Sequence, residues 1–114
     1  MAYDHVHLFD QVRSDLVQNP RLSLRSLSVK MKVDRHTIEK AIRAVDGRRF
    51  RDFRNQLMLD RARVLLSANG ASSIKEVAYL LGYSSPQAFA RFVRGMCGRS
   101  PGGLRLAQDG QHLA

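Results

Sequence analysis

The sequence has little capacity for disulfide bonds and no long apolar run. Its 114 residues include one cysteine, Cys97, so no disulfide can form within the chain, which fits a reducing compartment. No stretch of about 18 consecutive apolar residues is present, as a membrane-spanning helix would need. The N-terminal segment has no basic cluster followed by an apolar core, so we expect no secretory signal and a cytoplasmic location.

The sequence also lacks the spacing patterns that catalysis and metal binding require. It contains no nucleophile paired with a base, no metal-ligand spacing and no glycine-rich phosphate loop. His5 and His7 are two positions apart and would point to different sides of a helix, which makes them a poor metal pair. We therefore expect no enzymatic activity, no metal site and no cofactor.

Acidic residues are scarce relative to basic ones. The chain has 19 Lys and Arg against 10 Asp and Glu, a formal net charge of +9. Such an excess favours a polyanionic partner, with nucleic acid ahead of an anionic membrane surface. Aromatic residues make up only 7% of the chain, and no aromatic stacking platform typical of single-strand and RNA readers is visible. Because 44% of the residues are hydrophobic, the chain should fold, and residues 1–114 are long enough for one domain.

The stretch 73–98 is typical of two short helices joined by a tight turn. Ser73 and Glu76 have the spacing of a capping box, and Gly82 offers the positive φ that a sharp turn needs. Ser85 and Pro86 are suited to the cap and first position of the second helix. The expected inner-face residues are Ile74, Val77, Ala78 and Leu81 on the first helix and Phe89, Phe92, Val93 and Met96 on the second. The polar outer face of the second helix makes this a helix-turn-helix pattern.

A repeat of this unit lies at residues 23–47. With a shift of 50, Ser23 falls on Ser73 and Leu27 on Val77; with a shift of 51, Ile38 falls on Phe89 and Ile42 on Val93. The predicted inner face of the second helix is Ile38, Ala41, Ile42 and Val45. The sequence therefore predicts two helix-turn-helix units; a helical solenoid is the less favoured reading, because solenoids need three or more repeats.

Three further helices are expected around the two units. Residues 5–18 should form one before Asn19-Pro20, residues 50–68 a long linking helix, and residues 101–107 a short final helix followed by a frayed tail. The linking helix has a broad apolar side, suited to packing against both units. The predicted fold is all-α, with two homeodomain-like helix-turn-helix subunits, a linking helix and about seven helices in total.

The motifs of the second unit resemble those of a known family. Ile74-Lys75-Glu76-Val77-Ala78, Gly82-Tyr83, Phe89-Ala90-Arg91 and Gly98-Arg99-Ser100-Pro101 are similar to the DNA-binding domain of the AraC/XylS transcription regulators. The resemblance covers about residues 22–106. The chain differs from the family pattern at Ser28, Lys32, Arg54, Met58 and Leu104. The family usually attaches a ligand-binding or dimerisation domain, so the chain either resembles the members that consist of this domain alone or is a fragment of a larger effector-responsive regulator.

The resemblance implies sequence-specific binding of double-stranded DNA, with recognition helices in successive major grooves about one helical turn, roughly 34 Å, apart. Gln87 is suited to adenine and Arg91 to guanine, while Arg94 is expected at phosphate. The full set of candidate DNA-contacting residues is Arg35, His36, Glu39, Lys40, Arg43, Ser85, Gln87, Ala90, Arg91, Arg94 and Arg99. Arg48, Arg49 and Arg51 are further candidates for phosphate contact.

The expected partners are duplex DNA and, as a further candidate, RNA polymerase, with the domain itself monomeric and located at the nucleoid. The main alternative is a helix-turn-helix module that binds another regulator or the polymerase instead of DNA. An exposed apolar patch would favour that alternative, whereas the predicted outer faces are charged.

Overall fold

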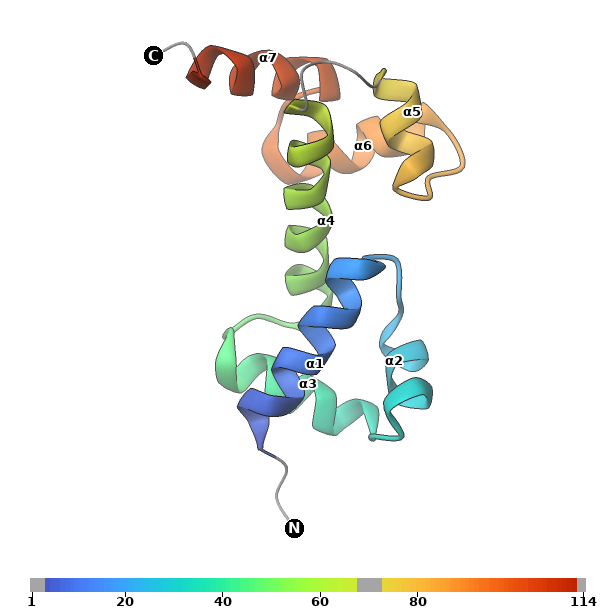
Figure 1. The fold of residues 1–114 in the computed structure, drawn as a ribbon, viewed down its shortest axis with the longest axis vertical. Helices are drawn as coiled ribbons and strands as arrows, with labels where there is room; N and C mark the ends of the chain where they lie inside the picture. Colours follow the sequence, from blue (N-terminus) through green and yellow to red (C-terminus); the bar gives the residue numbers. More distant parts are fainter. Residues whose placement is uncertain (1–3, 68–72, 113–114) are drawn as a thin grey trace. The chain divides into compact units, whose positions relative to one another are not determined.

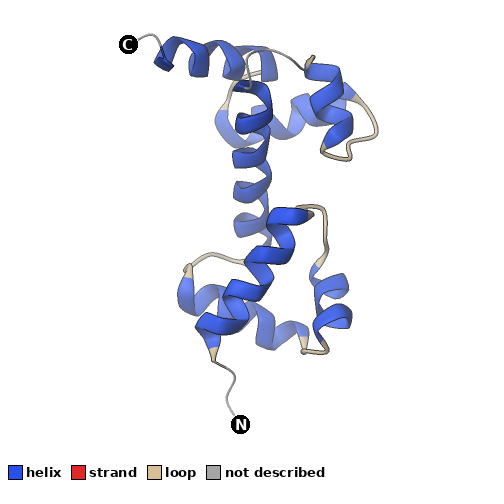
Figure 2. Ribbon diagram, in the orientation of Figure 1, coloured by secondary structure: helices blue, strands red, loops and turns tan. Residues whose placement is uncertain are grey.

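The computed structural model describes residues 4–67 and 73–112, with side chains as far as Leu106. All regular structure in these ranges is helical (Figures 1 and 2). The seven helices found there are α1 (His5–Gln18), α2 (Leu24–Met31), α3 (Arg35–Val45), α4 (Phe50–Ser67), α5 (Ile74–Leu80), α6 (Pro86–Cys97) and α7 (Pro101–His112). The prediction of an all-α fold with two helix-turn-helix units and a linking helix is confirmed.

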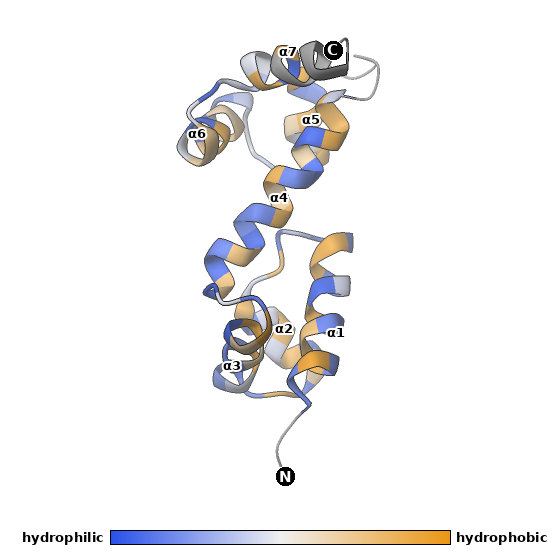
Figure 3. Ribbon diagram, turned by 90° about the vertical axis from the view of Figure 1, so that its left-hand side faces the viewer, coloured by the Kyte–Doolittle hydropathy of each residue, from blue (hydrophilic) through white to orange (hydrophobic). Residues whose placement is uncertain are grey.

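The chain forms two compact units, Met1–Leu57 and Met58–Ala114. The division falls inside α4, so one helix supplies residues to both cores. Phe50 and Phe53 belong to the first core, while Met58, Ala62 and Leu66 belong to the second. Hydrophilic and hydrophobic positions are accordingly mixed along α4 (Figure 3). This explains the broad apolar side that the sequence shows between 50 and 68.

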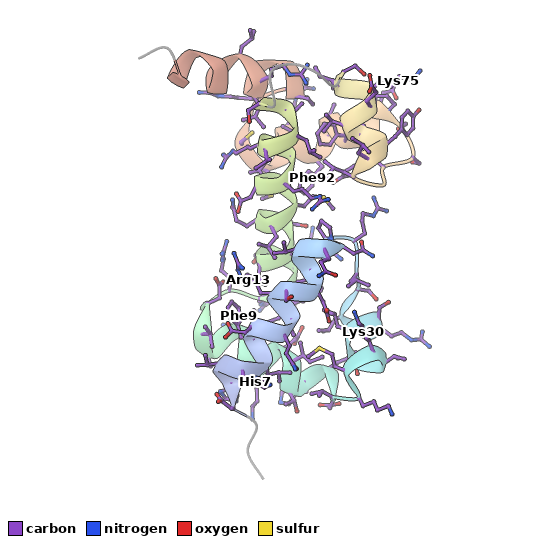
Figure 4. The ribbon with its side chains drawn as sticks, viewed as in Figure 1. His7, Phe9, Arg13, Lys30, Lys75 and Phe92 are labelled. Atoms are coloured by element: carbon purple, nitrogen blue, oxygen red, sulfur yellow. The ribbon has the colours of Figure 1, made fainter. Side chains whose placement is uncertain are left out.

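The first core is built from α1, α2, α3 and the start of α4. Val12, Leu16, Leu27, Ile38 and Ile42 are fully buried there. The ring of Phe9, labelled on α1 in Figure 4, lies 5.1 Å from the ring of Phe53 on α4. Helix α1 thus packs against α3 and supports it from the side opposite its exposed face.

The second core is built from the rest of α4 with α5, α6 and α7. Leu66, Val77, Phe89 and Val93 are fully buried. The Tyr83 ring lies 5.4 Å from the Phe89 ring and 5.9 Å from that of Phe92, which is labelled in Figure 4. Two departures from the family pattern, Met58 and Leu104, are buried in this core.

Helix α7 is tied to α4 within the second unit. Arg105 donates a hydrogen bond from Nε to the carbonyl oxygen of Leu66, at 2.9 Å. Ser100 accepts the backbone N–H of Gly103 at 3.0 Å and so caps the start of α7. The helix continues to His112, so the prediction that it ends near residue 107 is wrong.

The predicted inner faces are correct except at one helix end. Val45 was expected to be buried but is 41% exposed, because it is the last residue of α3 and extends past the core. Tyr79 is also exposed, on the outer side of α5. The predicted linking helix ends at Ser67 in the structure; Ala68, its last predicted residue, lies outside the described residues.

Candidate nucleic-acid interface

The turns of the two units share one backbone hydrogen bond at equivalent positions. The N–H of Val33 donates to the carbonyl of Ser28 at 3.2 Å, and the N–H of Tyr83 donates to the carbonyl of Ala78 at 3.0 Å. Each turn also contains one residue with positive φ: Lys32 at 56° and Gly82 at 88°. The repeat read from the sequence is therefore a repeat of backbone geometry, and it places α3 and α6 in equivalent positions within their units.

Helix α3 presents a polar face to solvent. Ile38, Ala41 and Ile42 are buried, and this fixes the rotation of the helix. The five predicted contact residues on α3 are all exposed: Arg35, His36, Glu39, Lys40 and Arg43. The structure thus brings these side chains together on one helix, with three cations and one carboxylate among them.

Helix α6 presents the corresponding face of the second unit. Phe89 and Val93 are fully buried, while Gln87, Arg91 and Arg94 are exposed. Ala90 is half-buried. Arg99, also exposed, lies between α6 and α7. The stretch from Val77 to Gln108 contains no acidic residue, so this face carries only positive formal charge.

The two helices begin with different capping groups. Asp34 caps α3, and its Oδ2 accepts the N–H of His36 at 3.1 Å and that of Thr37 at 3.4 Å. Ser85 caps α6, and its Oγ accepts the N–H of Ala88 at 3.2 Å. The Ser85 cap was predicted. The carboxylate at the start of α3, however, occupies N–H groups that a helix N-terminus would otherwise offer to phosphate.

The candidate cations on α3 and α6 are exposed and available for an external anion. The ion pairs found among the described residues are Lys30 with Asp15, Arg48 with Asp46, and Arg63 with Asp60. None of them involves a candidate contact on α3 or α6. Lys30, labelled in Figure 4, is held 3.2 Å from Asp15 and lies outside the candidate set.

Arg48 is the candidate phosphate contact whose role the structure changes. Its Nε lies 2.7 Å from Oδ2 of Asp46 and its Nη2 lies 3.1 Å from Oδ1. This paired hydrogen bond lowers the pKa of Asp46 below its ordinary value of 3.8. The Asp-Gly-Arg sequence that closes α3 was the available signal for the pairing, and reading the sequence for basic residues alone missed it.

Neither a metal centre nor a membrane-spanning helix emerges from the described residues. No group of three or more His, Cys, Asp or Glu side chains is placed to hold a metal ion in those parts of the chain. No helix there is both long and apolar enough to cross a bilayer.

The chain matches a known protein family. Residues 27–107 match the family described as "Helix-turn-helix domain", which covers more than half of the chain. No curated protein sequence gives a match.

Several solved structures share the fold. The C-terminal domain of AraT, a response regulator from Geobacillus stearothermophilus, superposes with a TM-score of 0.75 at 21% identity, covering 93% of this chain and 87% of that one. The DNA-binding domain of AdpA, solved in complex with a target DNA, superposes with a TM-score of 0.74 at 22% identity, covering 90% of this chain and 94% of that one. An AraC-type regulator from Chromobacterium violaceum superposes with a TM-score of 0.74 at 24% identity, covering 87% of this chain and 89% of that one.

Proposed function

Because the chain belongs to the AraC-type helix-turn-helix family, we propose that it is a transcription regulator that binds double-stranded DNA sequence-specifically through α3 and α6. The observation that carries the proposal is the pair of exposed, cation-bearing helix faces at equivalent positions in two repeated units. The AdpA domain with the same fold was solved bound to a target DNA, which supports a duplex partner here.

The residues divide into base readers and backbone contacts. Gln87 and Arg91 lie in the first half of α6, where a recognition helix meets base edges; an amide pairs with adenine and a guanidinium with guanine. His36 and Lys40 hold the corresponding positions on α3, with Arg35 beside them at its first residue, and Glu39 has the chemistry to accept from cytosine. Arg94, Arg43 and Arg99 lie further along and are assigned to phosphates, which position the protein without reading sequence.

Selection of bound duplexes from genomic DNA tests the proposal. A chain with two reading helices should enrich sites with two half-sites about one helical turn apart. Affinity should fall steeply as salt rises, because each neutralised phosphate releases counterions. A library that stays unenriched, together with a salt-independent signal, would count against DNA binding.

A protein-binding function has one observation in its favour. Tyr79 and Leu80 are adjacent on α5 and are 49% and 66% exposed, and Val29, equivalent to Tyr79, is also exposed in the first unit. A regulator that recruits RNA polymerase needs such a surface away from its DNA-reading helix. Tyr79→Ser with Leu80→Ser should then leave DNA affinity unchanged and reduce transcription from the bound promoter. The domain alone is further proposed to be monomeric and to act at the nucleoid.

A further inference from the structure

The capping residues of α3 and α6 occupy equivalent positions but differ in charge. Asp34 falls on Ser85 with the same shift of 51 that aligns the two helices. Both side chains cap their helix: Asp34 accepts two backbone N–H groups of the first turn, and Ser85 accepts one. Only Asp34 brings a negative charge to the helix start, so the two caps differ in charge and in the number of N–H groups that they accept.

The charge of Asp34 acts where a recognition helix meets DNA. The N-terminus of a helix carries about half a positive elementary charge, which favours phosphate. Asp34 offsets this charge on α3 and takes up the N–H groups of His36 and Thr37. On α6, Ser85 adds no charge, Pro86 has no N–H, and the Ser85 side chain accepts the N–H of Ala88 and not that of Gln87.

The surrounding charges extend the same asymmetry. Helix α3 has carboxylates along its whole length: Asp34 is its N-terminal cap, Glu39 lies near its middle, and Asp46 is its C-terminal cap. Asp46 additionally engages Arg48. The second unit has no acidic residue between Glu76 and Asp109, a stretch that includes all of α6.

We propose that Asp34 makes the two units unequal in DNA binding. The second unit binds duplex DNA of any sequence through its phosphate contacts, in addition to the base contacts assigned to Gln87 and Arg91. The first unit engages only where its base contacts offset the repulsion between Asp34 and the phosphates. Asp34 is in this sense a specificity-determining residue that touches no base. This inference rests on the proposed function, because it assumes that both helices meet DNA.

Cap exchange isolates the charge from the structural role of the cap. Asp34→Ser keeps a good capping residue and removes the charge, and Ser85→Asp adds a charge and keeps a good cap. Asp10→Asn removes the same charge from an exposed position on α1 that caps nothing, and it controls for net charge. Thermal unfolding of each variant checks that the fold is retained.

Binding is measured by fluorescence anisotropy on a mixed-sequence duplex and on the selected site, over a range of salt concentrations. Ser85→Asp should weaken binding to the mixed-sequence duplex about two- to fivefold, the size of one helix-terminus charge interaction. Asp34→Ser should strengthen binding to the selected site by a similar factor, and Asp10→Asn should change it much less.

Arg43 and Arg94 are equivalent residues on the two helices and serve as a matched pair. On mixed-sequence DNA, Arg94→Ala should weaken binding and reduce the salt slope by about one, while Arg43→Ala should change little. On the selected site, both variants should weaken binding.

Equal effects of Arg43→Ala and Arg94→Ala on mixed-sequence DNA would overturn the inference, as would equal effects of Asp34→Ser and Asp10→Asn. Failure of the unmodified protein to bind any duplex would instead overturn the proposed function, and the inference with it. The two failures are therefore distinguishable.

Discussion

Ser28 donates a hydrogen bond from Oγ to the carbonyl oxygen of Val33 at 2.6 Å, across the turn between α2 and α3. The N–H of Val33 in turn donates to the carbonyl of Ser28, so the two residues are joined twice. The second unit has only the backbone bond, because alanine stands at the equivalent position, Ala78. The side-chain bond thus holds a turn that lacks the glycine found in the second unit.

Replacing Ser28 with alanine should destabilise the first unit. The hydroxyl is partly buried, and a lost hydrogen bond of this kind costs about 1 kcal/mol. Urea unfolding should show the loss as a lower midpoint with an unchanged m-value. Ser84→Ala replaces an exposed serine in the other turn, and its free energy of unfolding should stay within about 0.5 kcal/mol of that of the parent. Equal losses in both variants would contradict the role assigned to the Ser28 hydroxyl.

The positive-φ residues in the turns of the two units, Lys32 and Gly82, should respond in opposite directions to substitution. Gly82→Ala places a Cβ on a residue at φ 88° and should cost about 1 kcal/mol, whereas Lys32→Gly relieves strain at φ 56° and should stabilise by about 0.5 kcal/mol. Gly95→Ala, in the middle of α6 with open space around the added Cβ, should stabilise by about 0.5–1 kcal/mol. Thermal unfolding measures all three. A destabilising Gly95→Ala would show that backbone conformation does not decide the sign.

Amphipathic spacing predicted most of the fold. Seven helices, their buried residues such as Ile38 and Phe89, and their caps follow from local patterns that the sequence displays directly. The prediction errors lie at the ends of helices. Val45 has the right spacing for burial but no core beside it, and α7 continues past residue 107 despite its glycines.

The candidate site was predictable as a set of exposed residues, but its electrostatics were not. Spacing on a helix places Arg91 and Lys40 outward, and the structure agrees. Spacing does not reveal that Asp46 holds Arg48 through two hydrogen bonds. Such interactions depend on the rotamer and backbone angles of single residues, which a periodicity does not specify.

The Asp46–Arg48 pair should make a small, pH-dependent contribution to stability. The pKa of Asp46 is lowered in the folded chain, so the contribution is present above the ordinary value of 3.8 and is lost as the pH falls through the folded value. Because Arg48 is 44% exposed, we expect at most about 1 kcal/mol at neutral pH. The difference in unfolding free energy between the parent and Asp46→Asn should therefore shrink below pH 3.8. A difference that stays constant down to that range would refute an ionic contribution.

Arg91 and Arg99 should differ in how their loss affects DNA binding. Arg91 lies on the exposed face of α6 among the candidate base readers, and Arg91→Ala should cost about 1–3 kcal/mol at sites that carry its preferred base and little at others. Arg99 lies past the end of α6, where only phosphates are expected, so Arg99→Ala should weaken all sequences alike and reduce the salt slope by about one. Affinities for a panel of single-base variants of the selected site, measured at several salt concentrations, separate the two effects. If both variants weaken every duplex by the same factor, Arg91 is a backbone contact, and the reading of bases must be assigned to Gln87 or to α3.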